Sequence, residues 1–289
     1  MTSDPAAPPP TPRQPAPRPS RRRGRWPLAV VVVWALLLVG LGYLSARRDP
    51  PSVREQRSIG QATPVVDRAT AQLLVAAGRD VVADIAGRTL DEGCRITPLR
   101  SGGVLYSELT LYTSEAGGPA LLDRIAGALP GSYGARVRHD ADQGTHALRA
   151  DAGEFVTIRG RVDPPGAVIL TVSTGCRPVD VQVADLAVGR PIDEEPMRVL
   201  AALGAAGVQS GRTVGVSCPV GSAMFTAHAT GRVDGDRPFA DALRPLRAGA
   251  TVVLDTPERF AYRTETRGVV VQRGDDQVRV SVTAACAAG

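Results

Sequence analysis

The sequence predicts an α+β protein: a single transmembrane helix followed by two tandem, duplicated, disulfide-stapled small α+β units. Three observations lead to this fold class. They are an uncharged run at Trp26–Ala46, an order of strands and helices that occurs twice, and four cysteines that are widely spaced along the chain. In each unit we expect a helix packed on a mainly antiparallel sheet.

The first 25 residues are rich in Pro and Arg, and they contain no large aliphatic side chain besides Met1. Such a segment buries too little apolar surface to offset the entropy lost on ordering, so residues 1–25 are expected to form a disordered cytoplasmic tail. This tail carries the whole formal net charge of +5, because the acidic and basic residues of the remaining chain balance. We therefore expect no nucleic-acid-binding surface on the folded part.

The 34 basic residues are all arginines, and the chain contains neither Lys nor Asn. This bias is typical of proteins from genomes rich in G and C, such as those of actinobacteria. It also excludes mechanisms that need a lysine, among them phosphate-loop nucleotide binding and Schiff-base chemistry.

The run Trp26–Ala46 is predicted to be a transmembrane helix. At about 1.5 Å per residue it matches the roughly 30 Å hydrocarbon core of a bilayer. Its apolar core is longer than the about 7–15 residues of a signal peptide, which favours an uncleaved anchor. Aromatic residues near its ends and flanking arginines are expected at the membrane interface. These residues are Arg21, Arg22, Arg23, Arg25, Trp26, Tyr43, Arg47 and Arg48.

Two repeats are predicted to follow a juxtamembrane linker at residues 47–64. Repeat 1, residues 65–178, has predicted helices at Asp67–Ala86 and Pro119–Leu129 and strands at Val104–Thr113, Ala135–His139, Thr145–Ala150, Glu154–Val162 and Ala167–Ser173. Repeat 2, residues 179–289, has predicted helices at Glu194–Ala206 and Pro238–Leu246 and strands at Ala223–Val233, Ala250–Asp255, Arg259–Glu265, Gly268–Gln272 and Gln277–Thr283. A linking strand is expected at Val179–Val183. The alternative is a pair of unrelated α+β domains.

The four cysteines allow three pairings. The duplication favours Cys94–Cys176 and Cys218–Cys286, because each of these bonds joins the start of a unit to its end. Zinc sites usually contain close pairs such as Cys-x-x-Cys, and this chain has none. Disulfides form in oxidising compartments. We therefore expect a single-pass protein of the cell membrane with a cytoplasmic N-terminus and extracytoplasmic C-terminal domains.

The segment Thr174-Gly175-Cys176 lies at the end of a predicted strand and is similar to the strand-end Thr-x-Cys of sortases. Cys176 has a structural counterpart at Cys286, however, and no histidine lies at a matching upstream position. We interpret Cys176 as a disulfide cysteine, which is not a nucleophile.

The three histidines are interpreted as structural. His139 and His146 bracket a polar segment that is typical of a hairpin turn, and we favour this interpretation over a cation site. His228 is expected to face outward from a strand. The sequence contains neither a Gly-x-Ser-x-Gly nor a His-Glu-x-x-His motif. We therefore predict no catalytic, cofactor-binding or metal-ligating residue.

These observations favour a binding or assembly module of the cell envelope, with no catalysis and no cofactor. Its expected partner is another envelope protein or a cell-wall component. The alternative is an extracytoplasmic cell-wall hydrolase that uses dispersed Asp and Glu residues, since paired carboxylates need not be neighbours in sequence. A deep cleft with converging carboxylates favours the hydrolase, whereas a shallow surface favours the binding module.

Overall fold

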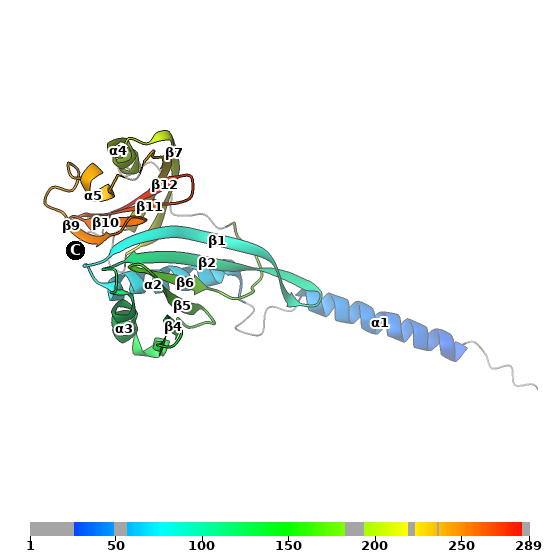
Figure 1. The fold of residues 1–289 in the computed structure, drawn as a ribbon. Coiled ribbons are helices and arrows are strands. Elements are labelled where there is room, and N and C mark those ends of the chain that lie inside the picture. The colour runs from blue at the N-terminus through cyan, green and yellow to red at the C-terminus, as the bar shows by residue number, and fades with distance from the viewer. Residues whose placement is uncertain (1–25, 49–56, 183–193, 219–222, 236, 285–289) are drawn as a thin grey trace, which may run out of the picture. The chain divides into compact units, whose positions relative to one another are not determined.

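The structure is a computed structural model that describes residues 26–48, 57–182, 194–218, 223–235 and 237–284 (Figure 1). The chain divides into two compact units, residues 1–50 and 51–289. The tail predicted at residues 1–25 lies outside the described residues. The predicted boundaries of the repeats, at residues 65–178 and 179–289, stay a prediction.

The first unit contains helix α1 (Trp26–Arg48), whose described side chains are almost all exposed. Trp26 and Tyr43 are 81% and 57% exposed. The transmembrane helix predicted over residues 26–46 is not found: within the described ranges, no helix is both long enough and apolar enough to cross a membrane. Of the arginines predicted at the membrane interface, Arg21, Arg22, Arg23 and Arg25 lie outside the described residues. Arg47 and Arg48 end α1, and their side chains are not described.

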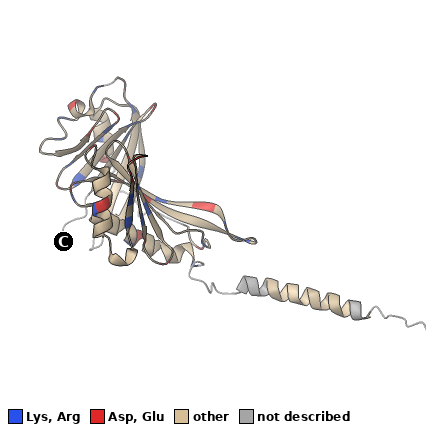
Figure 2. Ribbon diagram, turned by 60° about the horizontal axis from the view of Figure 1, so that its bottom comes forward, with Lys and Arg blue, Asp and Glu red and all other residues tan. Residues whose placement is uncertain are grey.

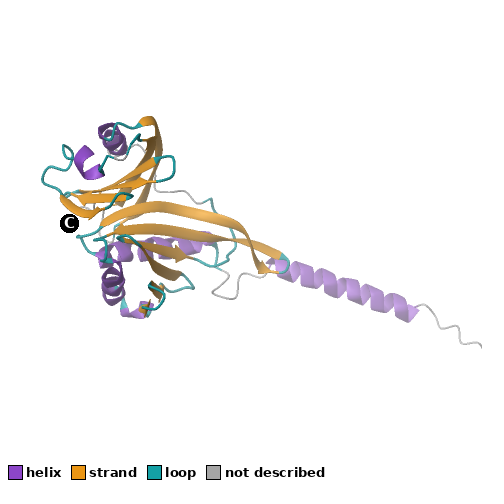
Figure 3. Ribbon diagram, viewed as in Figure 1, coloured by secondary structure: helices purple, strands orange, loops and turns teal. Residues whose placement is uncertain are grey.

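The second unit is built mainly from two antiparallel sheets of six strands each (Figure 3). The first sheet has the order β1-β2-β6-β5-β4-β3 and the second has the order β7-β8-β12-β11-β10-β9. The first sheet consists of β1 (Val82–Thr97), β2 (Arg100–Tyr112), β3 (Arg136–Asp140), β4 (Thr145–Asp151), β5 (Thr157–Asp163) and β6 (Ala167–Ser173). The second sheet consists of β7 (Ala206–Ser217), β8 (Ala223–Arg232), β9 (Thr251–Asp255), β10 (Arg259–Arg263), β11 (Arg267–Arg273) and β12 (Val278–Ala284).

Few helices accompany these strands. The first sheet has α2 (Ile59–Ala77), α3 (Gly118–Ala128) and a 3-10 turn, η2 (Gly131–Tyr133); the second has α4 (Glu195–Ala202) and α5 (Phe239–Ala242). The strand order is the same in both sheets, and in each a helix precedes the first strand and another follows the second. The predicted α+β class is nevertheless wrong, because the second unit is built mainly from two antiparallel six-stranded sheets and has few helices.

The largest single error concerns residues 67–97. The predicted helix Asp67–Ala86 is in fact α2, which ends at Ala77, followed by β1 from Val82. Helix α2 also begins at Ile59, inside the predicted linker, where Ser58 and Gln61 form a capping box. Pro64 lies inside this helix, although a proline at an interior position usually indicates the end of a helix.

In the second half of the chain, the strand β7 was not predicted, and the helix predicted at Pro238–Leu246 is only the short α5. No strand forms at residues 179–182, and residue 183 lies outside the described part.

Apolar side chains form two main cores, of which the first lies beneath the first sheet and also includes Val214 and Val216 of β7, and the second lies beneath the second sheet. Helices α2 and α3 pack on one face of the first sheet, and α4 and α5 pack on one face of the second. A smaller core joins the two sheets. It consists of Val82, Tyr112 and Ala167 from the first sheet with Leu254, Ala261 and Val270 from the second.

Candidate functional site

Five exposed arginines lie on the face of the first sheet that points away from α3. The strand register places Arg136 opposite Arg149, and Arg149 opposite Arg159. In the next row, Arg138 and Arg161 flank Ala147. We refer to these five residues, Arg136, Arg138, Arg149, Arg159 and Arg161, as the arginine face.

Strand alternation explains why these arginines share one face. Successive side chains of a strand point to opposite faces, so the alternate residues Val137, Leu148 and Ile158 point to the other side. Leu148 and Ile158 are buried in the core beneath α3. Gly160 allows a close approach there, because a Cβ at this position would lie 2.7 Å from a Leu170 methyl group.

The arginine face is not neutralised by nearby acids. Within the described residues, the strand register places three like charges directly opposite one another. Arg161 forms an ion pair with Asp163 (3.4 Å), whereas no ion pair among the described residues joins an acid to Arg136, Arg138, Arg149 or Arg159. Like charges placed directly opposite each other on neighbouring strands destabilise a sheet. Figure 2 shows how basic and acidic residues are distributed over the strands.

The acids closest in sequence lie at strand ends and have other partners. Asp140 accepts a hydrogen bond from the Gln143 backbone (3.1 Å), and Asp151 accepts one from the Gly153 backbone (2.8 Å). Asp163 binds Arg259 of the second sheet at 2.6 Å. Within the described residues, none of these carboxylates forms an ion pair with Arg136, Arg138, Arg149 or Arg159.

A hollow of about 1140 Å³ runs along β3 and β4 beside these residues, and Arg136, Arg138, Arg149 and Tyr133 contribute to its lining. Burial, partly offset by Arg68, raises the pKa of Tyr133. Asp140 and Asp151 also line the hollow. Its three guanidinium groups and one phenol outnumber these two carboxylates, a set suited to an anion.

A second hollow, of about 660 Å³, lies beside β1 and is lined by residues of both charges, including Arg88, Glu92 and Asp180. Asp180 accepts a hydrogen bond from the Gly60 backbone (2.9 Å) at the start of α2. The hydrogen bonds from Ser58 and from that backbone lower the pKa of Asp180, against the effect of burial. Its carboxylate therefore has a capping role.

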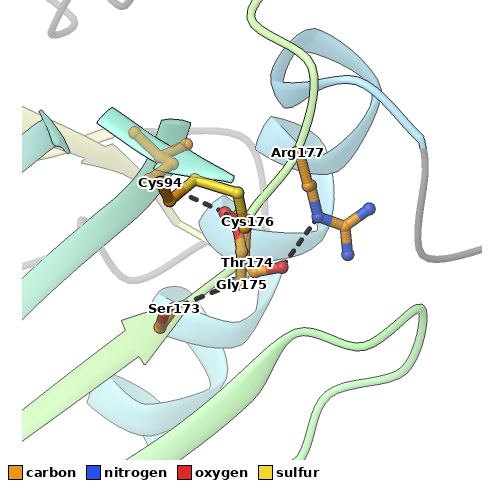
Figure 4. Close-up of a disulfide and its surroundings, with 7 residues drawn as sticks. Cys94, Ser173, Thr174, Gly175, Cys176 and Arg177 are labelled. Carbon is orange, nitrogen blue, oxygen red and sulfur yellow. Dashed lines mark hydrogen bonds between the residues drawn. A yellow bond between two sulfur atoms is a disulfide. The ribbon is translucent and has the colours of Figure 1, made fainter. Parts of the chain in front are cut away.

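The predicted bond Cys94–Cys176 is confirmed, with an S–S distance of 2.04 Å (Figure 4). In this bond Cys176 has no free thiolate, so it cannot act as a nucleophile. Cys218 is also disulfide-bonded. Cys286, its predicted partner, lies outside the described residues.

The predicted hairpin turn between His139 and His146 is confirmed, since β3 and β4 pair antiparallel on either side of it. The prediction for His228 is wrong, because its side chain is only 10% exposed and contacts Asp84 of the first sheet at 2.7 Å. His228 does point to the predicted face of its strand, but the first sheet covers that face and buries the side chain. Among the described residues, no group of three or more His, Cys, Asp or Glu side chains forms a metal cage.

The arginine face was not predicted. A usable signal was present in Arg136-Val137-Arg138 and Arg159-Gly160-Arg161, because two arginines separated by one residue share a face of a strand. The overall balance of charge concealed this local concentration.

No family model matches the chain, and no curated protein matches it. A solved structure that resembles part of the chain is the crystal structure of a DUF4853 family protein from Actinomyces odontolyticus ATCC 17982, at 14% sequence identity and a TM-score of 0.34. The similarity covers 54% of this chain and 86% of that one. A TM-score this low supports no statement about fold or function.

Proposed function

We propose that this protein works outside the cytoplasm, at the cell membrane, as a binding module without catalytic activity. Its arginine face is proposed to bind an anionic polymer of the cell envelope. The observation that carries this proposal is the row of Arg136, Arg149 and Arg159, three directly opposed cations with no ion pair among the described residues.

The proposed location is supported by the Cys94–Cys176 bond, because disulfides persist in oxidising compartments. Adding a protease to intact cells tests this location. We expect residues from about position 57 onward to be digested while a cytoplasmic control protein stays intact. If these residues are digested only after the cells are lysed, the proposed location is wrong.

An anionic polymer suits the arginine face in both geometry and charge. Neighbouring strands lie about 4.8 Å apart, so the row presents three guanidinium groups at short, regular steps. Each guanidinium has a planar fork of donors that matches a phosphate or carboxylate group. Binding also relieves the repulsion between the opposed arginines. The hollow over β3 and β4 fits a chain lying in a groove better than it fits a flat bilayer surface.

Nucleic acid would satisfy the same charge, but it is not the expected partner in an oxidising compartment outside the cytoplasm. The proposed ligand is therefore an envelope polymer that carries regularly spaced phosphate or carboxylate groups.

Binding of the purified full-length protein to long-chain inorganic polyphosphate tests the proposal. The variant Arg136→Gln, Arg149→Gln, Arg159→Gln is expected to bind at least about tenfold more weakly, because charge-assisted contacts contribute about 1.5–3 kcal/mol each. Its affinity should also depend less steeply on salt, because fewer counterions are released.

The matched control removes the same charge elsewhere, through Arg79→Gln, Arg95→Gln and Arg100→Gln, which are exposed residues away from the arginine face. Equal losses in the two triple variants would mean that only net charge matters. A third arm uses phosphatidylglycerol vesicles. Tighter arginine-dependent binding to vesicles than to polyphosphate counts against a polymer ligand.

A further inference from the structure

The two histidines of the β3–β4 hairpin face each other on the side opposite the arginine face. His139 and His146 are paired in the strand register, and their Nδ1 atoms are 2.7 Å apart. Their ring centroids are 5.0 Å apart at an interplanar angle of 60°. Asp123 of α3 approaches the same pair, with its Oδ1 atom 3.0 Å from Nε2 of His139.

These distances fix which nitrogen atoms carry protons when both rings are neutral. An ionised carboxylate only accepts hydrogen bonds, so Nε2 of His139 donates to Asp123. Nδ1 of a neutral His139 is then unprotonated, and it accepts a hydrogen bond from Nδ1 of His146. The lone pair of His139 Nδ1 is thus directed at His146.

We propose that this pair binds a divalent transition-metal ion such as Zn²⁺ through the two Nδ1 atoms. Metal-binding histidines commonly donate their other ring N–H to a carboxylate, and Asp123 stands in this relation to His139. Binding moves the proton of His146 from Nδ1 to Nε2, which frees a second lone pair. Asp123 acts as a positioning residue and does not touch the metal.

The geometry needs only a small adjustment. Two nitrogen ligands of tetrahedral zinc, each about 2.0–2.1 Å from the metal, lie roughly 3.3 Å apart. The rings therefore separate by about half an ångström to admit the ion. Because the described residues offer two ligands and no three-residue cage, water or another ligand fills the remaining positions.

The site is open to ions in solution, since the side chains of His139 and Asp123 are 38% and 58% exposed. Imidazole ligands favour zinc, copper and nickel over magnesium and calcium, which prefer oxygen. This site is separate from the arginine face and does not depend on the function proposed for it.

Calorimetric titration of the untagged full-length protein with Zn²⁺ tests the proposal. We expect one saturable site, which His139→Gln or His146→Gln abolishes and which Ca²⁺ does not fill. Asp123→Asn should weaken binding about 10–100-fold, because it removes the carboxylate that orients His139. The matched control is Asp142→Asn, an exposed carboxylate in the same hairpin turn, and it should leave the affinity unchanged.

Two results would overturn the site. One is binding to the wild type that equals binding to both histidine variants, and the other is a loss that follows Asp142→Asn instead. The variants alter exposed or half-exposed side chains, and circular dichroism verifies that they fold. Imidazole NMR gives an independent readout: His139 should carry its proton on Nε2 before zinc is added, and both Nδ1 resonances should shift with zinc.

Discussion

Arg177 is fully buried although it carries a charge, and it lies next to the disulfide cysteine Cys176 (Figure 4). Its guanidinium donates to three backbone carbonyls, those of Thr174 (2.8 Å), Arg57 (3.3 Å) and Glu154. Burial lowers the pKa of Arg177, and the nearby Glu154 carboxylate partly offsets this effect. A single side chain thereby ties the end of β6 to the start of α2 and to the turn after β4.

Replacing Arg177 with Met removes the donors while keeping most of the side-chain volume. Three carbonyls then lack their guanidinium partner, and each buried group left without one costs about 1–3 kcal/mol. We expect Arg177→Met to lower the free energy of unfolding by about 3–5 kcal/mol, as measured in urea. Arg159→Met, at an exposed position, should change it by less than about 0.5 kcal/mol. An unchanged urea midpoint for Arg177→Met would contradict the role assigned to these hydrogen bonds.

At the scale of elements, regular alternation made strands predictable. β6 was predicted at its observed bounds, and β4, β10 and β12 were predicted to within two residues of theirs. These strands are short, and their buried and half-buried residues recur at every second position or form a continuous run.

The strands that were missed lack this regularity. β1 contains register shifts around Gly87 and Gly93, and both glycines have positive φ angles of 91° and 112°. Bulges of this kind break the alternation on which strand prediction depends. In β7, register shifts between Ala206 and Gln209 and between Ser210 and Thr213 have the same effect. These two long strands account for much of the difference between the predicted α+β class and the observed sheets.

The arginine face illustrates a further limit of the sequence. Each Arg-x-Arg pair indicates one face of one strand, but only the pairing of β3, β4 and β5 brings Arg136, Arg149 and Arg159 into one row. The approach of Asp123 to His139 likewise depends on how α3 packs on the hairpin. Local sequence patterns do not predict contacts between elements that are distant in sequence.

At the scale of the second unit, a buried chain of hydrogen bonds joins the two sheets. Thr283 of β12 donates to the carbonyl of Ala83 in β1 (2.6 Å), 200 residues away in sequence. Thr226 of β8 then donates to Thr283 (2.7 Å) and accepts from the backbone of Ile85 (3.3 Å). Beside this chain, His228 contacts Asp84. Every donor in the chain has an acceptor, so the contact between the sheets requires a specific alignment of β1 on β8 and β12.

Replacing Thr283 with Val keeps the side-chain shape and removes the hydroxyl that links the chain. The Ala83 carbonyl and the Thr226 hydroxyl then lose their partner inside a buried contact, so we expect a loss of about 1–3 kcal/mol in the free energy of unfolding. Thr226→Val interrupts the same chain, and the double variant should therefore cost less than the sum of the two single variants. Urea unfolding of the four proteins measures this difference.

Thr157→Val, on an exposed position of β5, serves as the control and should add independently to either change. Strict additivity of Thr226→Val and Thr283→Val would show that the two hydroxyls act separately, and the hydrogen-bond chain would then not be what aligns the two sheets.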